Sequence, residues 1–527
     1  MVTWNSSANK WRFLILILLL LGIFFRFFNL DYKVYWHDEV YTTMRAAGFT
    51  RGEIDAELFQ NQIIPATSLQ KFQQIKPQST INDTIKSLAI EDPQHPPLYF
   101  LMSRFWMQAF GSSLAASRFL PALLSLLSLP LMYGLAWELF QFRLAAWLAT
   151  IFLALSPFDL LFAQTARQYS LLTVTIIGSG YFLLRGMRSP TWKNWGFYTL
   201  FSTIGLYAHP FLGLTLIGHF SFVVCHWLAE RRERSQKFTQ QNLFKFLLSS
   251  IIITILYSPW LIILKNNAQR MQATTDWARA KVEFIYLVKL WILSFTSLFL
   301  DLDFGFDSVW TYVLRFIILS IIIAAIYQVC RQTQKTTWLF ILTSVFVPFL
   351  LLLIPDLILG GKRSAVSRYL ISSYPGIQLA VAYFFATKII SGKQLWRGVL
   401  ALLLTGSLAS LTVSAMTNTW WSKDLSHSNA EVAKIINSAS FPLVISDIGD
   451  DYTNTGDLIS LSYQLNDDVN LLLVSKTPSL KLVQGEFNVF VFRPSGKLWQ
   501  AFKKEKIPVK LLYPPGNLWR IQPKVVK

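Results

Sequence analysis

Charged residues are scarce in this sequence of 527 residues. Asp, Glu, Lys and Arg together make up 15% of the chain, whereas soluble domains carry about 25%. Hydrophobic residues reach 53%, and the mean hydropathy is +0.40. This composition excludes an ordinary soluble protein and predicts a polytopic membrane protein, whose chain crosses the bilayer several times.

Cysteines and acidic residues are also few. The two cysteines, Cys225 and Cys330, lie in apolar runs, so we expect no disulfide framework. Zinc-finger spacings and Gly-rich nucleotide motifs are absent from the sequence. The 29 acidic residues are outnumbered by 48 basic ones, which gives a net charge of +19. In a membrane protein this excess indicates cytoplasmic loops and contacts with the lipid bilayer, and no nucleic acid is expected as a partner.

Long apolar runs predict about eleven membrane spans. They cover residues 11–30, 119–140, 144–162, 169–184, 195–207, 211–228, 243–264, 310–330, 337–354, 369–389 and 398–416. The first run follows Lys10 and Arg12 as in a signal peptide, but no small-residue cleavage site comes after it. We therefore interpret it as a retained first span.

Two shorter apolar segments, 96–110 and 284–300, decide the topology. If both lie in the membrane interface, the basic loop around 231–245 faces the cytoplasm, as the positive-inside rule requires. If both span, which gives thirteen spans, this loop would be translocated. We adopt the first arrangement, with the N-terminus inside the cell. The loop contains Arg231, Arg232, Arg234, Lys237 and Lys245.

The domain organisation follows from these spans. Residues 1–416 form a membrane module, in which residues 31–117 are a large first external loop with interfacial helices. Residues 417–527 have the composition of a small soluble α/β domain on the extracytoplasmic side. Their β-rich runs are 441–446, 469–474, 488–492 and 509–512, and an amphipathic helix covers 429–438. The domain has no visible nucleophile or metal-ligand spacing, which favours an accessory or acceptor-docking role.

Three polar groups follow the first span directly: His37, Asp38 and Glu39. They stand between the aromatic residues Trp36 and Tyr41. Two carboxylates just outside a bilayer suit acid/base or metal chemistry on a membrane-borne substrate. The alternative is a helix that starts with acidic residues, because negative charge is favourable in the first turn.

Several cations lie outside the cell in this topology, against the general bias. A lipid phosphate at the outer head-group level would explain them, because guanidinium and ammonium groups bind phosphate well. The alternative is that they are ordinary helix-end anchors at the lipid surface. These cations are Arg167, Lys265, Arg270, Arg279, Lys281, Lys362, Arg363 and Arg368.

Four short motifs occur in a fixed order along the chain. They are Asp38-Glu39, His95-Pro96-Pro97-Leu98-Tyr99, Ser156-Pro157 with Ala166-Arg167-Gln168-Tyr169, and Ser367-Arg368-Tyr369-Leu370, which opens a late span. Over roughly residues 11–390 the sequence resembles the polyprenyl-phosphate-sugar glycosyltransferases of the GT-C superfamily. It is most similar to glycosyltransferase family 39, which includes the protein O-mannosyltransferases and the aminoarabinose lipid A transferases.

The resemblance implies an all-α polytopic membrane enzyme of the inner, or cell, membrane. Such an enzyme transfers a sugar with inversion from a polyprenyl-phosphate donor to a hydroxyl group of a lipid, glycan or protein acceptor on the outer face. An acidic residue of the first external loop serves as the base. By position, Asp38 is the base and Glu39 its neighbour, with His37 and His95 as further site residues.

The resemblance also assigns the donor phosphate site and leaves a cofactor open. Arg167, Tyr169, Arg368 and Tyr369 match the family's loops, and Lys362 and Arg363 precede them at the same surface. Relatives often carry an acid where this chain has Gln164. An amide is a poor ligand for a divalent cation, so a metal is possible but not assigned. A membrane transporter or lipid flippase is the alternative function, although such proteins place more ionisable residues in their spans.

Overall fold

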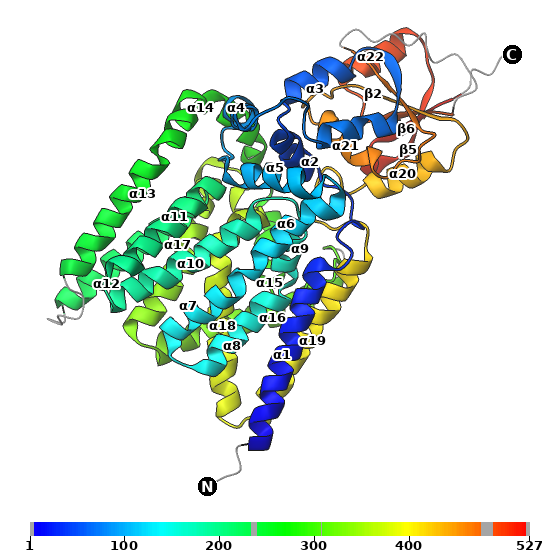
Figure 1. Cartoon of the computed structure of the whole chain (residues 1–527). Coiled ribbons are helices and arrows are strands. Elements are labelled where there is room, and N and C mark those ends of the chain that lie inside the picture. Colours follow the sequence, from blue (N-terminus) through cyan, green and yellow to red (C-terminus); the bar gives the residue numbers. More distant parts are fainter. Residues whose placement is uncertain (1–4, 233–239, 307, 476–487, 523–527) are drawn as a thin grey trace. The chain divides into compact units, whose positions relative to one another are not determined.

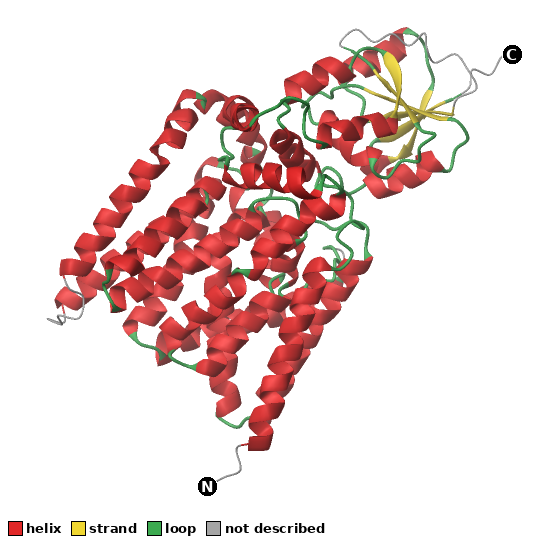
Figure 2. Cartoon of the chain, in the orientation of Figure 1, coloured by secondary structure: helices red, strands yellow, loops and turns green. Residues whose placement is uncertain are grey.

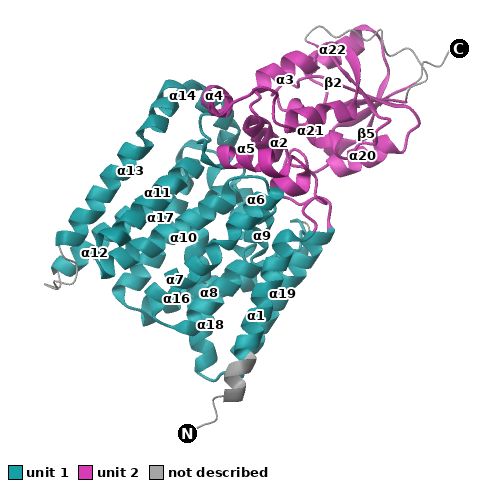
Figure 3. Ribbon diagram, viewed as in Figure 1, with its two compact units in different colours: residues 1–28, 92–99, 118–416 teal, residues 29–91, 100–117, 417–527 magenta. Residues whose placement is uncertain are grey.

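The computed structural model describes residues 5–232, 240–306, 308–475 and 488–522 (Figure 1). Most of these residues are helical, and the strands gather in a single sheet (Figure 2). The chain divides into two compact units (Figure 3). Unit 1 comprises residues 1–28, 92–99 and 118–416, and unit 2 comprises residues 29–91, 100–117 and 417–527. Most of the loop predicted at residues 31–117 is therefore grouped with the C-terminal segment, whereas its residues 92–99 belong to unit 1.

Long helices make up unit 1. They are α1 (Asn5–Phe27), α6 (Leu114–Leu126), α7 (Ser128–Phe140), α8 (Arg143–Leu155), α9 (Pro157–Ala163), α10 (Tyr169–Arg188), α11 (Trp192–Ala208), α12 (Leu212–Arg232), α13 (Gln240–Asn266), α14 (Ala268–Thr275), α15 (Phe284–Thr296), α16 (Val309–Gln332), α17 (Lys335–Leu359), α18 (Tyr374–Ile390) and α19 (Gln394–Met416), where α6 begins in unit 2. Seven helices of the described chain are long and apolar enough to cross a membrane, or eight if the bent pair α8 and α9 counts as one span. The prediction of a multi-pass helical membrane protein is confirmed.

Each of the eleven predicted spans coincides with a helix or a pair of helices, but three need comment. Helices α11 and α18 have 17 residues each, about 26 Å of helix against a hydrocarbon core of about 30 Å. Helix α1, as far as it is described, is not one of the seven helices that are long and apolar enough to cross a membrane. The prediction of a single helix over residues 369–389 is wrong. Ser367–Ser373 form the 3-10 helix η4, and α18 begins at Tyr374, next to Pro375.

The two segments that decide the topology form short helices. Helix α5 (Leu98–Phe110) and helix α15 (Phe284–Thr296) have 13 residues each. At 1.5 Å per residue each is about 20 Å long, too short to cross a bilayer core of about 30 Å. Their lengths support the arrangement in which neither segment spans. In the basic loop between α12 and α13, Arg234 and Lys237 lie outside the described residues.

Unit 2 combines the first loop and the C-terminal segment in one fold. The loop supplies α2 (His37–Ala47), α3 (Arg51–Leu58), β1 (Gln62–Pro65), the 3-10 helix η1 (Ala66–Gln73) and α4 (Ile81–Glu91). The C-terminal segment supplies α20 (Asn429–Asn437), β2 (Pro442–Ser446), α21 (Asn454–Ser462), β3 (Asn470–Leu473), β4 (Asn488–Phe492), α22 (Gly496–Lys504), β5 (Val509–Tyr513) and β6 (Leu518–Ile521). The predicted α/β character of residues 417–527 is confirmed.

The six strands follow the order β1-β3-β2-β4-β6-β5. Strand β2 runs parallel to β3 and β4, whereas β1 pairs antiparallel with β3, which places Ile63 opposite Leu472. One face of the sheet is sealed by apolar side chains, because Leu443, Ile445 and Val491 pack with Leu498 of α22 and are fully buried. A strand from the first loop thus completes a sheet that begins more than 370 residues later, and this pairing was not predicted.

The predicted sidedness can be tested by cysteine labelling. With Cys225 and Cys330 replaced by serine, single cysteines at the exposed positions Glu57 and Ser440 of unit 2 should react with a membrane-impermeant maleimide on intact cells. A cysteine at exposed Lys393, between α18 and α19, should react only after lysis, because basic loops stay in the cytoplasm. Labelling of Lys393→Cys on intact cells at the rate of Ser440→Cys would contradict the topology.

Candidate active site

Helix α2 carries the acidic pair in its first turn and begins directly at His37. The carboxylate of Glu39 accepts a hydrogen bond from the backbone N–H of Trp36 at 2.9 Å, which satisfies a donor at the start of the helix. The helix ends at Gly48, whose φ of +96° is a left-handed conformation that favours glycine. A Cβ atom there would lie only 2.9 Å from the Cβ of Ser79. Both ends of α2 are therefore fixed by specific residues.

The carboxylate of Glu39 is buried in an ion pair. Its Oε2 lies 2.9 Å from the Nζ of Lys423, and the side chains of Lys423 and Glu39 are 1% and 0% exposed. The same ammonium group lies 5.7 Å from the centre of the Trp36 ring. One carboxylate thus caps α2 and also balances a buried cation. Through these contacts the side chain of Glu39 stabilises the start of α2.

Asp38 occupies the neighbouring position of the same turn and differs from Glu39 in its exposure. Its side chain is half-buried, whereas that of Glu39 is fully buried. The backbone carbonyl of Asp38 accepts a hydrogen bond from the Thr42 hydroxyl at 2.9 Å. Because successive helical residues point about 100° apart, the contacts that enclose Glu39 leave Asp38 on a different face. Of the two predicted acids, Asp38 is the more exposed.

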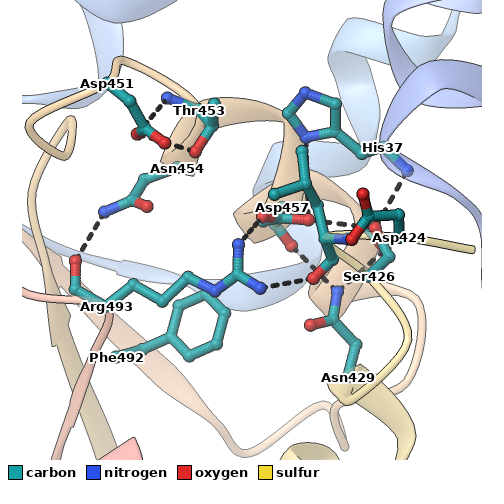
Figure 4. Close-up of polar contacts among 12 residues, drawn as sticks. His37, Asp424, Ser426, Asn429, Asp451, Thr453, Asn454, Asp457, Phe492 and Arg493 are labelled. Carbon is teal, nitrogen blue, oxygen red and sulfur yellow. Dashed lines mark hydrogen bonds and ion pairs between the residues drawn. The ribbon is translucent and has the colours of Figure 1, made fainter. Parts of the chain in front are cut away.

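His37 is held by residues of the C-terminal segment (Figure 4). Its backbone N–H donates to the Oγ of Ser426 at 2.9 Å, and its Nδ1 lies 3.6 Å from Oδ1 of Asp457. The Ser426 hydroxyl donates to the same Asp457 oxygen at 2.9 Å, while Arg493 forms an ion pair with the other oxygen. Burial alone would raise the pKa of Asp457, but His37 and Arg493 hold it below its ordinary value. His37 therefore links the start of α2 to a buried carboxylate.

In unit 1, His95 connects a carboxylate to a guanidinium group. Its Nδ1 lies 3.0 Å from Oδ2 of Asp92, and its Nε2 lies 3.1 Å from a terminal nitrogen of Arg167. A guanidinium group can only donate, so Nε2 accepts and the proton of the ring sits on Nδ1, facing Asp92. Arg167 is 4% exposed. The carboxylate and the imidazole together fix the position of this buried cation.

His209 lies between α11 and α12, beside the same group. Its ring centre is 6.1 Å from that of His95 and 5.9 Å from that of Tyr169. The backbone N–H of Phe211 donates to Nδ1 of His209 at 3.1 Å, so the neutral ring carries its proton on Nε2.

The charge state of His209 follows from its surroundings. Burial first, and then the electrostatic effects of His95, Arg167 and Arg368, lower the pKa of His209 well below its ordinary value. His209 is thus a neutral hydrogen-bond donor among cations. The Phe211 ring lies 4.7 Å from that of His209 and 4.5 Å from that of Tyr369, so the segments that carry Arg167 and Arg368 both lie near these rings.

Aromatic rings support the remaining cations. The guanidinium carbon of Arg368 lies 5.5 Å from the centre of the Trp277 ring. The Nζ of Lys362 lies 5.3 Å from the same ring centre. Arg368 also lies 5.7 Å from the ring of Tyr369, which packs edge-on against Phe211 at 4.5 Å. Such cation–π contacts stabilise a positive charge without neutralising it. We call these three cations, Arg167, Lys362 and Arg368, together with the adjoining histidines His95 and His209, the cationic cluster.

Two predicted site residues have structural partners instead. Arg363 lies 2.8 Å from Oδ1 of Asp356, whose side chain is 0% exposed. The amide of Gln164 donates to the carbonyl oxygens of Phe25 at 2.7 Å and Phe28 at 2.8 Å, which satisfies the last turn of α1. Because the charge of Arg363 is balanced and the amide of Gln164 is used, we leave both out of the cationic cluster.

No residue is assigned to a metal ion. Among the residues that the structure describes, no three His, Cys, Asp or Glu side chains converge in a group that could hold one. The carboxylate of Asp92 already lies 3.0 Å from Nδ1 of His95.

Sequence reasoning missed His209, Trp277 and Lys423. His209 precedes Pro210 at the end of an apolar run, just as His95 precedes Pro96. This repeated His-Pro pair was a usable signal. The sequence around Trp277 and Lys423 carries no such pattern, because their partners lie far away in the chain.

Comparisons with known proteins agree with the fold. The model of the dolichyl-phosphate-mannose-protein mannosyltransferase family matches residues 94–263, about a third of the chain, a stretch that includes His95, Arg167 and His209. No curated protein sequence gives a significant match.

Two solved structures have a similar fold over nearly the whole chain. One is ArnT from Cupriavidus metallidurans in the apo state, with a TM-score of 0.56, 13% identity and 98% of each chain covered. The other is ArnT from Cupriavidus metallidurans bound to undecaprenyl phosphate, with a TM-score of 0.51, 12% identity and 98% of each chain covered. The chain is thus similar to the mannosyltransferase family over residues 94–263 and has a fold similar to that of ArnT over nearly its whole length. The transporter alternative is not favoured.

Proposed function

We propose that this protein is a membrane glycosyltransferase, which takes a sugar from a polyprenyl-phosphate carrier and transfers it, with inversion, to a hydroxyl group of an acceptor at the outer face of the cell membrane. The observation that carries the proposal is a continuous series of contacts between the two arginine segments. Arg167 lies 3.1 Å from His95, whose ring centre is 6.1 Å from that of His209. The ring centre of His209 lies 4.7 Å from that of Phe211, which packs at 4.5 Å against Tyr369, the neighbour of Arg368. The similar fold of a protein solved with undecaprenyl phosphate supports the choice of donor.

The cationic cluster has the chemistry of a phosphate site. Two guanidinium groups can each grip phosphate oxygens with two parallel N–H donors, and Lys362 adds a compact charge. His209 adds an N–H donor without another charge, since its proton sits on Nε2. The Asp92–His95 contact and the Trp277 ring hold these groups in place before a ligand arrives. Preorganised donors of this kind stabilise charge that develops on a leaving group.

The transfer itself is a single displacement. The acceptor oxygen forms a bond to the anomeric carbon from one face, while the bond from that carbon to the phosphate oxygen breaks on the other face. The electron pair of the broken bond leaves on the lipid phosphate, and the acceptor proton passes to the carboxylate of Asp38. Glu39 and His37 do not take part in this step, because their side chains hold α2 through Lys423 and Asp457.

The role of Asp38 predicts a specific loss. Asp38→Asn keeps the size of the side chain but removes the proton acceptor, so the turnover number should fall by about 10²–10⁴-fold. Binding of undecaprenyl phosphate should remain, since that contact does not use Asp38. Asp467→Asn, an exposed position of unit 2, is the matched control and should match the parent. Turnover of Asp38→Asn within a few-fold of the parent would remove the base from the mechanism.

The phosphate site predicts that lysine cannot replace arginine. Arg167→Lys and Arg368→Lys keep the charge but lose the planar fork, so each should weaken undecaprenyl phosphate binding by about 10–100-fold. Thermal stability in detergent should stay close to that of the parent. Arg185→Lys, at the exposed end of α10, controls for the substitution. Equal binding by the parent and both cluster variants would show that these arginines are ordinary lipid anchors.

A further inference from the structure

A groove of about 1010 Å³ opens within unit 2, away from the residues discussed so far. All of its lining residues belong to this unit. They come from the segment after α1, from η1, from the end of α5 and the turn that follows it, and from the end of α21. Small-molecule sites are typically about 300–1,000 Å³. The groove therefore has room for several sugar rings.

The lining is polar but almost uncharged. Four glutamines contribute amide groups: Gln70, Gln74, Gln108 and Gln464. Ser112, Ser113 and Tyr463 contribute hydroxyl groups. Among the described residues that line the groove, Asp31 alone carries a charge. Amides and hydroxyls both donate and accept hydrogen bonds, as the hydroxyl groups of a neutral sugar do.

Other ligand classes fit this lining less well. A phosphate or another anion would meet only the negative Asp31 and no cation of the lining. A peptide is commonly held by an exposed strand edge or by pockets for its side chains. None of the groove residues belongs to the six strands of unit 2. The half-buried apolar residue Ile75 gives the C–H faces of sugar rings a surface to pack on.

The groove also borders a membrane helix and the acidic loop. Leu114, one of its lining residues, begins the membrane-length helical segment Leu114–Phe140. Asp31 precedes Asp38 by seven residues, a path of at most about 25 Å. The ring of Tyr463 packs edge-on against Tyr35 at 5.5 Å, and the Tyr35 hydroxyl lies 2.7 Å from that of Thr43 in α2. An oligosaccharide in the groove would thus lie near α2, and the chain that lines the groove at Leu114 continues into a helix of membrane length.

We propose that this groove binds the neutral oligosaccharide of a membrane-borne acceptor. The proposal rests on the proposed glycosyltransferase function and specifies its acceptor as a glycan that carries no charge. Gln74 and Gln108 are exposed, so they can contact such a glycan without loss of packing. Gln70 has a structural contact as well, since its amide donates to the carbonyl of Ser462 at 3.1 Å.

Equilibrium binding to the full-length protein in phospholipid nanodiscs tests the proposal. The probes are fluorescent maltotriose, cellotriose and mannotriose, each in free form and linked to an alkyl chain, with trigalacturonate and a Ser/Thr-rich peptide for comparison. At least one neutral trisaccharide should bind, and its alkyl-linked form should bind more tightly. Gln74→Ala/Gln108→Ala should weaken that binding by about tenfold or more. Gln500→Ala, at an exposed glutamine of α22 outside the groove, should not.

Several results would overturn the proposal. They are no binding of any neutral trisaccharide to the parent, equal binding by the parent and the double variant, equal binding of free and alkyl-linked forms, or a groove that takes the peptide or trigalacturonate instead. Undecaprenyl phosphate binding is measured on the same preparations. Its loss in the parent would contradict the proposed donor, whereas a change confined to the trisaccharides reports on the groove alone.

Discussion

The buried ion pair between Glu39 and Lys423 is the contact on which the acidic loop depends. Taking two charges out of water is costly, and removing one partner of such a pair destabilises a protein by about 3–5 kcal/mol because the other charge is left unbalanced. Here the same carboxylate also caps α2. The start of α2, and with it the orientation of Asp38, is therefore coupled to a lysine 384 residues further along the chain. Residues of the C-terminal segment therefore stabilise the structure of the acidic loop.

The cationic cluster obeys a different constraint. Several positive groups near one another repel, and the structure offsets this repulsion with aromatic faces at Trp277 and Tyr369 and with the Asp92–His95 contact. His209 stays neutral among them, which avoids a further charge. A doubly charged phosphate would relieve the remaining repulsion. The arrangement is thus one in which the anion itself completes the electrostatic balance.

Much of the fold could be predicted from the sequence, because apolar runs and strand-rich segments are local signals. The runs located the helices of unit 1, and four of the six strands were found within a residue or two at their ends. Strand β1 was missed because its four residues are identified only by pairing with β3. The break between η4 and α18 was missed because Ser367–Ser373 carry no strong helix-breaking residue.

The site was predicted less completely. Asp38 and Glu39 look alike in the sequence, and only the distant partner Lys423 separates their roles. Arg363 and Arg368 likewise form one basic run, yet Asp356 pairs with the first and Trp277 lies under the second. Pairings between distant positions decide the surroundings of each charged group, and a single sequence does not contain these pairings.

Hydrogen–deuterium exchange on α2 tests the central claim most directly, that Lys423 holds this helix through Glu39. In Lys423→Met, the backbone amides of His37–Ala47 should exchange faster than in the parent, whereas those of α10 should not change. Lys434→Met is the matched control, because Lys434 pairs with Glu431 on an exposed surface and should leave α2 unaffected. Unchanged exchange of α2 in Lys423→Met would contradict the account.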